Sequence, residues 1–198
     1  MYALIPQGFA SRLPLAALAA AVVAIATPSS AAVLAYTATF SGANEVPPNA
    51  SPGTGSALVD IDTGLHTMTI HATFSGLLGN TTAAHIHAAT AVAGAGTAGA
   101  ATTTPTFAGF PLGVTSGTYD RVLDLTLASS YNPSYVTAHG GTTATAEADL
   151  LQAIADGKAY FNIHSTLFGG GEIRGFLVPA TGTPASPETW GRNKSAYR

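Results

Sequence analysis

Apolar and polar side chains alternate with a period of two along much of the chain after residue 33. The side chains of Leu34, Tyr36, Ala38 and Phe40, for example, are separated by alanine or threonine. Successive side chains of a strand point to opposite faces, so each alternating stretch predicts a strand with one buried face. The alternation continues through 55–61, 68–74, 84–87, 119–127 and two closing segments around 160–164 and 171–175. Seven strands joined by turns predict an antiparallel β-sandwich or an open barrel.

Two segments depart from this period. In residues 145–156, Leu150 and Ile154 share one helical stripe, and Gly157 follows as a C-cap. This pattern predicts one short helix immediately before the closing hairpin, where it would cover an open end of the sandwich. Residues 88–117 are rich in Ala, Gly and Thr and have no period, which predicts a long surface crossover tethered to the core.

The first residues have the composition of a secretory leader. Arg12 precedes an apolar run over 13–26, and small residues follow up to Ala31 and Ala32. This order is typical of a signal peptide, and the run is shorter than the ~20 apolar residues of a membrane span. We expect residues 1–32 to be a signal peptide cleaved after Ala31 or Ala32, which leaves no membrane span and an exported protein in the periplasm, outside the cell or on its surface.

The remainder divides into a domain over 33–178 and a tail over 179–198 that is expected to be disordered, because the tail combines Pro, Thr, Ser and charge without periodicity. There is no cysteine, which excludes disulfides and thiolate metal sites. Charged residues make up only 9% of the chain, with a net charge of -3 and no basic cluster. This composition argues against nucleic-acid binding and against a polybasic membrane-surface site.

Six short motifs resemble those of the CHRD domain, the module named from chordin, in the order in which that family has them. They are SGANEVPP at 41–48, AAHIH at 83–87, FPLGVTSG at 110–117, YNP at 131–133, AYFNIH at 159–164 and GEIRG at 171–175. The resemblance covers about residues 36–178. It implies a mainly β fold, an immunoglobulin-like or superoxide-dismutase-like Greek-key sandwich. It implies little about activity.

A candidate metal site comes from the histidines of two predicted strands. His85 and His87 point the same way on either side of Ile86, and His164 on a neighbouring strand could supply a third imidazole. Imidazole nitrogen suits copper or zinc, and copper-zinc superoxide dismutases use a His-x-His strand in a similar sandwich. The alternative is structural: His85 and His164 would hydrogen-bond across strands, with Asn162, to satisfy buried backbone groups.

A structural polar cluster is expected near the closing hairpin. Glu172 and Arg174 are two residues apart, so they share a face of the predicted strand. In a chain with so few charges, this pair predicts a charge-assisted contact that closes the sheet, with Glu45 and Asn162 nearby. The alternative is a polar cluster that recognises a ligand.

The sequence favours an exported, non-enzymatic binding or structural module at the cell exterior, with an unidentified extracellular or envelope ligand. One alternative is a copper- or zinc-binding, superoxide-dismutase-like metalloprotein, and dismutation is the one enzymatic activity that the residues suggest. No Gly-x-Ser-x-Gly motif or paired carboxylates point to hydrolysis. A third alternative is a self-associating surface or matrix protein, suggested by the threonine-rich strand faces.

Overall fold

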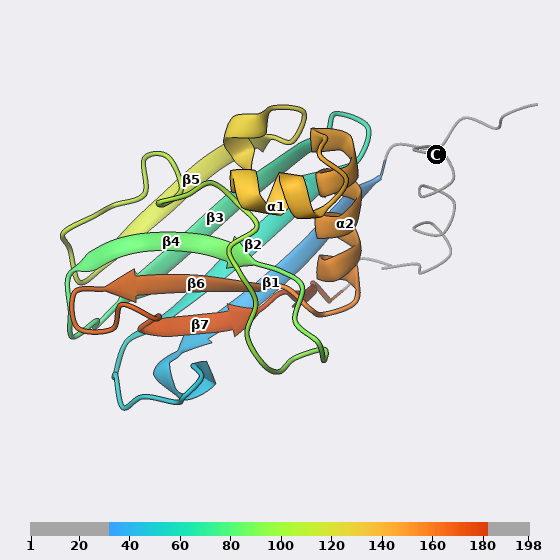
Figure 1. The fold of residues 1–198 in the computed structure, drawn as a ribbon. Coiled ribbons are helices and arrows are strands. Elements are labelled where there is room, and N and C mark those ends of the chain that lie inside the picture. Colours follow the sequence, from blue (N-terminus) through green and yellow to red (C-terminus); the bar gives the residue numbers. More distant parts are fainter. Residues whose placement is uncertain (1–31, 182–198) are drawn as a thin grey trace, which may run out of the picture.

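The computed structural model describes residues 32–181 (Figure 1). Residues 1–31 of the expected signal peptide and 182–198 of the expected tail lie outside the described residues. No helix within 32–181 is both long enough and apolar enough to cross a bilayer. The elements are β1 (Val33–Ser41), η1 (Gly42–Asn44), β2 (Thr54–Asp62), β3 (Thr67–Ser75), β4 (Thr81–His87), β5 (Gly117–Asp124), η2 (Ala128–Ser130), α1 (Pro133–Ala138), α2 (Thr143–Ala155), β6 (Tyr160–Ser165), β7 (Ile173–Phe176) and β8 (Val178–Pro179).

The strands form one curled antiparallel sheet in the order β4-β6-β7-β1-β2-β3-β5, and β8 pairs with β1. Strands β1, β2, β3 and β5 make a continuous layer, and β4, β6 and β7 lie in front of it in Figure 1. Pairing of Ser41 with Arg174 connects the two groups at the start of β7. The mainly β, sandwich-like architecture predicted from the alternation is therefore confirmed.

The core lies between the two layers. Along β1 the predicted inward residues Tyr36 and Phe40 are each 1% exposed, and the threonines between them face outward. Phe40 stacks on Phe161 of β6 with ring centroids 5.1 Å apart, so the two layers pack directly on each other. Burying such rings contributes about 1.5–3 kcal/mol each to the free energy of unfolding. The opposite face of the β4-β6-β7 layer carries the polar residues and does not take part in this packing.

The predicted helix is present as α2, whose stripe of Leu150 and Ile154 is fully buried. A second helix, α1, was not expected. Asn132 caps it, its side chain accepting a hydrogen bond from the Ser134 backbone, and Pro133 occupies the first turn. Asn followed by Pro is a helix-start signal, but a six-residue helix leaves too short a pattern to show a stripe. Both helices lie together at one end of the layers (Figure 1).

Two boundaries differ from the expected ones. The strand expected over 119–127 ends at Asp124, and Leu127, expected to point inward, is 51% exposed. The Asp124 side chain accepts hydrogen bonds from the backbone and hydroxyl of Thr126, which turns the chain out of the sheet. At the other end of the domain, Pro179 still pairs with Tyr36, so strand pairing continues one residue past the expected domain end at 178.

Candidate metal centre

The three candidate histidines lie on the outer face of the β4-β6-β7 layer. In the antiparallel pairing of β4 with β6, Asn162 is opposite His85, and Tyr160 is opposite His87. His164 is opposite Ala83, which places it diagonally beside His85. Ile86 points the other way and is completely buried in the core. The period of two therefore separates the imidazoles from the apolar interior.

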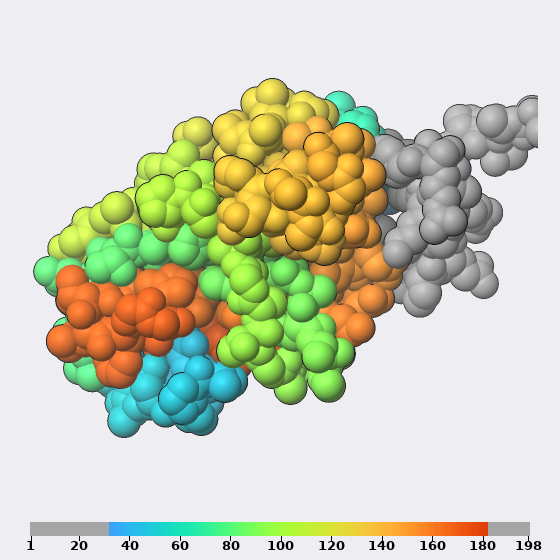
Figure 2. Space-filling model, in the orientation of Figure 1, coloured from blue at the N-terminus to red at the C-terminus, as the bar shows by residue number. Residues whose placement is uncertain are grey.

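The structure brings the three imidazoles into one cluster. One ring nitrogen from each of His85, His87 and His164 lies within 4.8 Å of the other two. The closest pair is Nδ1 of His85 and Nε2 of His164, 3.4 Å apart. The ring centroids are 5.2–5.7 Å apart. The segments that follow β4 lie across this face of the molecule (Figure 2).

Each imidazole donates a hydrogen bond to a backbone carbonyl of a loop. These three bonds are His85 Nε2 to Pro105 O at 2.6 Å, His87 Nδ1 to Ala98 O at 2.9 Å and His164 Nδ1 to Gly169 O at 3.0 Å. A carbonyl oxygen can only accept, so these partners assign the hydrogen to the bonded nitrogen of each ring. The opposite nitrogen of each neutral ring is then a bare lone pair.

The bare nitrogens receive no hydrogen bond from a donor within residues 32–181. Nδ1 of His85 and Nε2 of His164, which face each other, are both acceptors when their rings are neutral. Nε2 of His87 is buried and has no hydrogen-bond partner among residues 32–181. A buried polar atom without a partner costs about 1–3 kcal/mol, so the arrangement is unfavourable unless something occupies the space between the rings.

Burial keeps the three rings neutral. The pKa of His87 is lowered to about 4, mainly by burial and in smaller part by charge at His164, His85 and Arg174, against the raising effect of the bond to Ala98. Burial also lowers the pKa of His85 and of His164. Neutral imidazole is the form that ligates metal, so metal would meet little competition from protons near pH 7.

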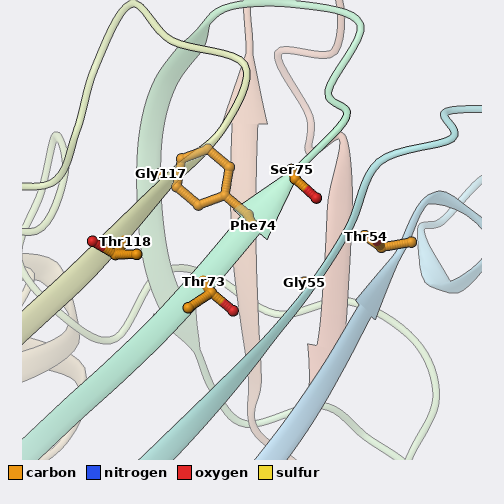
Figure 3. Close-up of a pocket in the computed structure, with 7 residues that line it drawn as sticks. All are labelled: Thr54, Gly55, Thr73, Phe74, Ser75, Gly117 and Thr118. Carbon is orange, nitrogen blue, oxygen red and sulfur yellow. The ribbon is translucent and has the colours of Figure 1, made fainter.

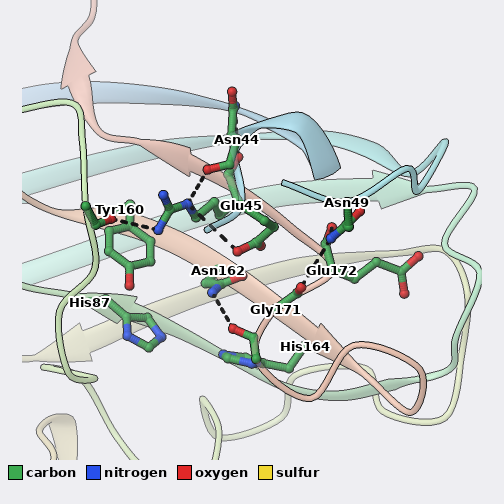
Figure 4. A network of polar contacts seen from close by, with 12 residues as sticks. Asn44, Glu45, Asn49, His87, Tyr160, Asn162, His164, Gly171 and Glu172 are labelled. Carbon is green, nitrogen blue, oxygen red and sulfur yellow. Dashed lines mark hydrogen bonds and ion pairs between the residues drawn. The ribbon is translucent and has the colours of Figure 1, made fainter. Parts of the chain in front are cut away.

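A stacked column of side chains supports the cluster. The His87 ring stacks on Tyr160 with centroids 4.9 Å apart and planes 6° from parallel. The Arg174 guanidinium lies 4.5 Å from the centre of the same tyrosine ring. Since β6 runs between β4 and β7, Tyr160 separates the histidine from the arginine (Figure 4). This packing fixes the orientation of the His87 ring.

Three of the four residues expected to form a polar cluster lie together next to the histidines. Nε of Arg174 is 3.8 Å from Glu45 Oε2 and donates to the Asn44 carbonyl. Asn162 on β6 pairs directly with Arg174 on β7. Oδ1 of Asn162 and Oε1 of Glu45 are both buried and have no hydrogen-bond partner among the described residues. Burial raises the pKa of Glu45 to about 7, although Arg174 opposes the shift.

Glu172 belongs to a different set of contacts. Its side chain, which is completely buried, accepts hydrogen bonds from the Ser51 hydroxyl and from the backbone of Leu78 and Gly79. These donors lower the pKa of Glu172, although desolvation opposes them. Gly171, immediately before it, turns the chain with a φ of +131°, so the carboxylate points away from Arg174. Glu172 therefore ties two loops to the hairpin and makes no direct contact with the arginine.

Sequence reasoning missed the three carbonyls that orient the imidazoles. They belong to loop backbone at Ala98, Pro105 and Gly169, and backbone carbonyls leave no mark on residue type. The sequence analysis gave Tyr160 no role in the histidine cluster. Its position directly opposite His87 in the register follows from strand pairing, which a single sequence does not specify.

A groove away from the histidines has fewer groups that could bind a metal or catalyse a reaction. It lies at the ends of β2, β3 and β5 and is lined by Thr54, Gly55, Thr73, Phe74, Ser75, Gly117 and Thr118 (Figure 3). These residues provide hydroxyls and one aromatic ring, and none of them titrates near neutral pH. The histidine cluster is therefore the candidate functional site.

Comparison with known families agrees with the motifs in the sequence. The profile of the CHRD domain matches residues 36–177, which include β1 through β7 almost in full and all three histidines. No curated protein and no solved structure matches the chain. The match extends over well more than half of the sequence, and the chain therefore belongs to the CHRD domain family.

Proposed function

We propose that this CHRD domain is an exported module that binds one transition-metal ion, copper or zinc, through His85, His87 and His164. Family membership supports a non-enzymatic module. The leader-like composition of residues 1–32 and the absence of cysteine favour a place outside the cytoplasm, where thiolate ligands are readily oxidised and histidine sites are not. The ligand left open by the sequence is then a metal ion.

The observation that carries the proposal is the convergence of three lone pairs with no donor between them. In metal sites, a ligating histidine almost always donates its other ring N–H to a carboxylate, a carbonyl or water, which fixes the tautomer. His85, His87 and His164 each do so with a carbonyl. The buried Nε2 of His87 has no hydrogen-bond partner in the described chain, which leaves this nitrogen available to a metal ion.

The spacing also suits a metal. Copper or zinc binds imidazole nitrogen at about 2.0–2.1 Å, so two nitrogens on one ion are about 3.3–3.5 Å apart. Nδ1 of His85 and Nε2 of His164 already have this separation, at 3.4 Å. A ring nitrogen of His87 lies within 4.8 Å of a nitrogen of each of the other two rings, so it would move by at most about 1.4 Å to complete the set. A proton shared between two rings would instead create an imidazolium, which burial disfavours here.

Elemental analysis tests the proposal. Protein purified without a histidine tag and exposed to copper or zinc should retain one ion per chain after desalting, and the H85A/H87A double variant should retain none. The matched control is H71A, because His71 is half-exposed on β3 and pairs with Asp120 away from the cluster. Absence of stoichiometric metal in the wild type, or equal metal in the double variant, would contradict the proposal.

A further inference from the structure

The cluster offers a metal ion no negative charge. Its three members are imidazoles, and neither a carboxylate nor a thiolate belongs to the group. The groups that accept their N–H bonds are the carbonyls of Pro105, Ala98 and Gly169, not the carboxylates that accept this bond in many zinc sites. No group in this first or second coordination shell therefore neutralises the charge of a bound ion.

A buried positive charge lies beyond the Tyr160 ring. Arg174 lies on the far side of Tyr160 from His87, and its charge acts on His87. The arginine is 2% exposed, so water screens its field weakly. This field opposes an additional positive charge at His87.

Neither of the neighbouring carboxylates belongs to the group of candidate ligands. Glu45 faces Arg174, and the rise of its pKa to about 7 leaves it only partly ionised at neutral pH. Glu172 is directed at Ser51 and at the backbone of Leu78 and Gly79. Among the charged groups that act on the pKa values of the three histidines, none is a carboxylate.

From this charge distribution we infer that the site selects monovalent copper, Cu⁺, over Cu²⁺ and Zn²⁺. The inference depends on the proposed function, since it concerns the ion held by the same three histidines. The free energy needed to move an ion out of water rises with the square of its charge, and neutral nitrogens offset the second charge of a divalent ion less than carboxylates or thiolates do. Zinc held by three histidines takes a water molecule as its fourth ligand. Cu⁺ accepts three nitrogen ligands without a fourth.

Paired affinity titrations test the inference. Under anaerobic conditions, competition with a chromogenic Cu⁺ chelator gives the dissociation constant for Cu⁺. Competition with chelators of known affinity for Cu²⁺ and Zn²⁺ gives the other two. We expect Cu⁺ to bind at least tenfold more tightly than either divalent ion. Equal or tighter binding of Cu²⁺ or Zn²⁺ through the histidines would overturn the inference and leave the proposed metal site intact. Binding of no ion, or binding that survives in H85A/H87A, would overturn both.

A carboxylate placed at the second shell should weaken the preference. Gly169, whose carbonyl accepts the His164 N–H, is exposed, and a Cβ added there meets nothing within 4 Å. G169D adds a negative charge near His164, and G169N is its neutral match. At a distance of roughly 8 Å, one charge should reduce the ratio of Cu⁺ to Cu²⁺ affinity about threefold to tenfold in G169D, with little change in G169N. An equal change in both variants, or a larger ratio in G169D, would contradict the electrostatic argument.

Discussion

The substitution H87F separates a metal-binding role of this residue from a structural one. Phenylalanine retains the flat ring that stacks on Tyr160 at 4.9 Å, and it removes both nitrogens. The variant loses the hydrogen bond from Nδ1 to Ala98, which contributes about 1 kcal/mol. The Ala98 carbonyl keeps a second donor, the Tyr160 hydroxyl at 3.3 Å.

The same substitution removes the buried Nε2 that has no partner among residues 32–181. Relief of such an atom is worth about 1–3 kcal/mol, so the metal-free variant should be as stable as the wild type or up to about 2 kcal/mol more stable. A ligand at one hundred times its dissociation constant stabilises the native state by about 2.7 kcal/mol. For a domain of this size, that free energy raises the Tm by roughly 5–10 °C.

In thermal melts monitored by circular dichroism, the order of the wild-type and H87F Tm values should therefore reverse when one excess equivalent of metal is added. Without metal, H87F should melt at or above the wild-type Tm, and with metal it should melt below. H71F is the control, because His71 lies outside the cluster and should leave the metal-dependent shift unchanged. A metal-free H87F that is more than about 2 kcal/mol less stable, or an equal shift in both proteins, would refute the reasoning.

Three other outcomes are expected. H164A should lower the free energy of unfolding by about 1–2 kcal/mol even in metal-free buffer, because it removes the bond to Gly169 and leaves a gap; unchanged urea denaturation would count against that role. G171A should lower the free energy of unfolding by about 3 kcal/mol or more, because the φ of Gly171 is +131° and the new Cβ would lie 2.7 Å from Glu45 Oε1. The control is G170A, where the new Cβ meets nothing within 4 Å, and equal losses in the two variants would contradict the steric argument. The raised pKa of Glu45, about 7 against 4.5 when unfolded, means that the native state binds more protons between these values. The contribution of Glu45 to stability is full below pH 4.5 and is lost as the pH rises through 7. Between pH 5 and pH 8 the free energy of unfolding of the wild type should therefore fall by roughly 2 kcal/mol relative to that of E45Q. Urea denaturation that depends on pH equally in both proteins would disprove this.

The alternation of side chains was sufficient to predict most of the strands and the separation of His85 and His87 from Ile86. Phe40, for example, lies inward because a strand allows it only two directions, and one of them meets the apolar face of β6. The end of β5 was wrong because Leu127 continues the alternating pattern after Asp124 has already turned the chain. A side-chain turn can thus overrule a favourable pattern.

The histidine cluster was only partly predictable. The shared face of His85 and His87 follows from their spacing, but their meeting with His164 depends on the register of β4 against β6. The contacts that assign the tautomers come from loop carbonyls at Ala98 and Pro105, whose positions depend on the path of the crossover from 88 to 116. Neither the register nor the loop path has a signature in residue types.

X-ray absorption at the metal edge tests the central claim most directly. Protein loaded with one equivalent of copper or zinc should show the multiple-scattering pattern of three imidazoles, with nitrogen neighbours at about 2.0 Å. In H87F, the number of imidazoles should fall to two. A spectrum of the wild type with one imidazole or none, or one that is unchanged in H87F, would show that the bare nitrogens of this face do not hold the ion.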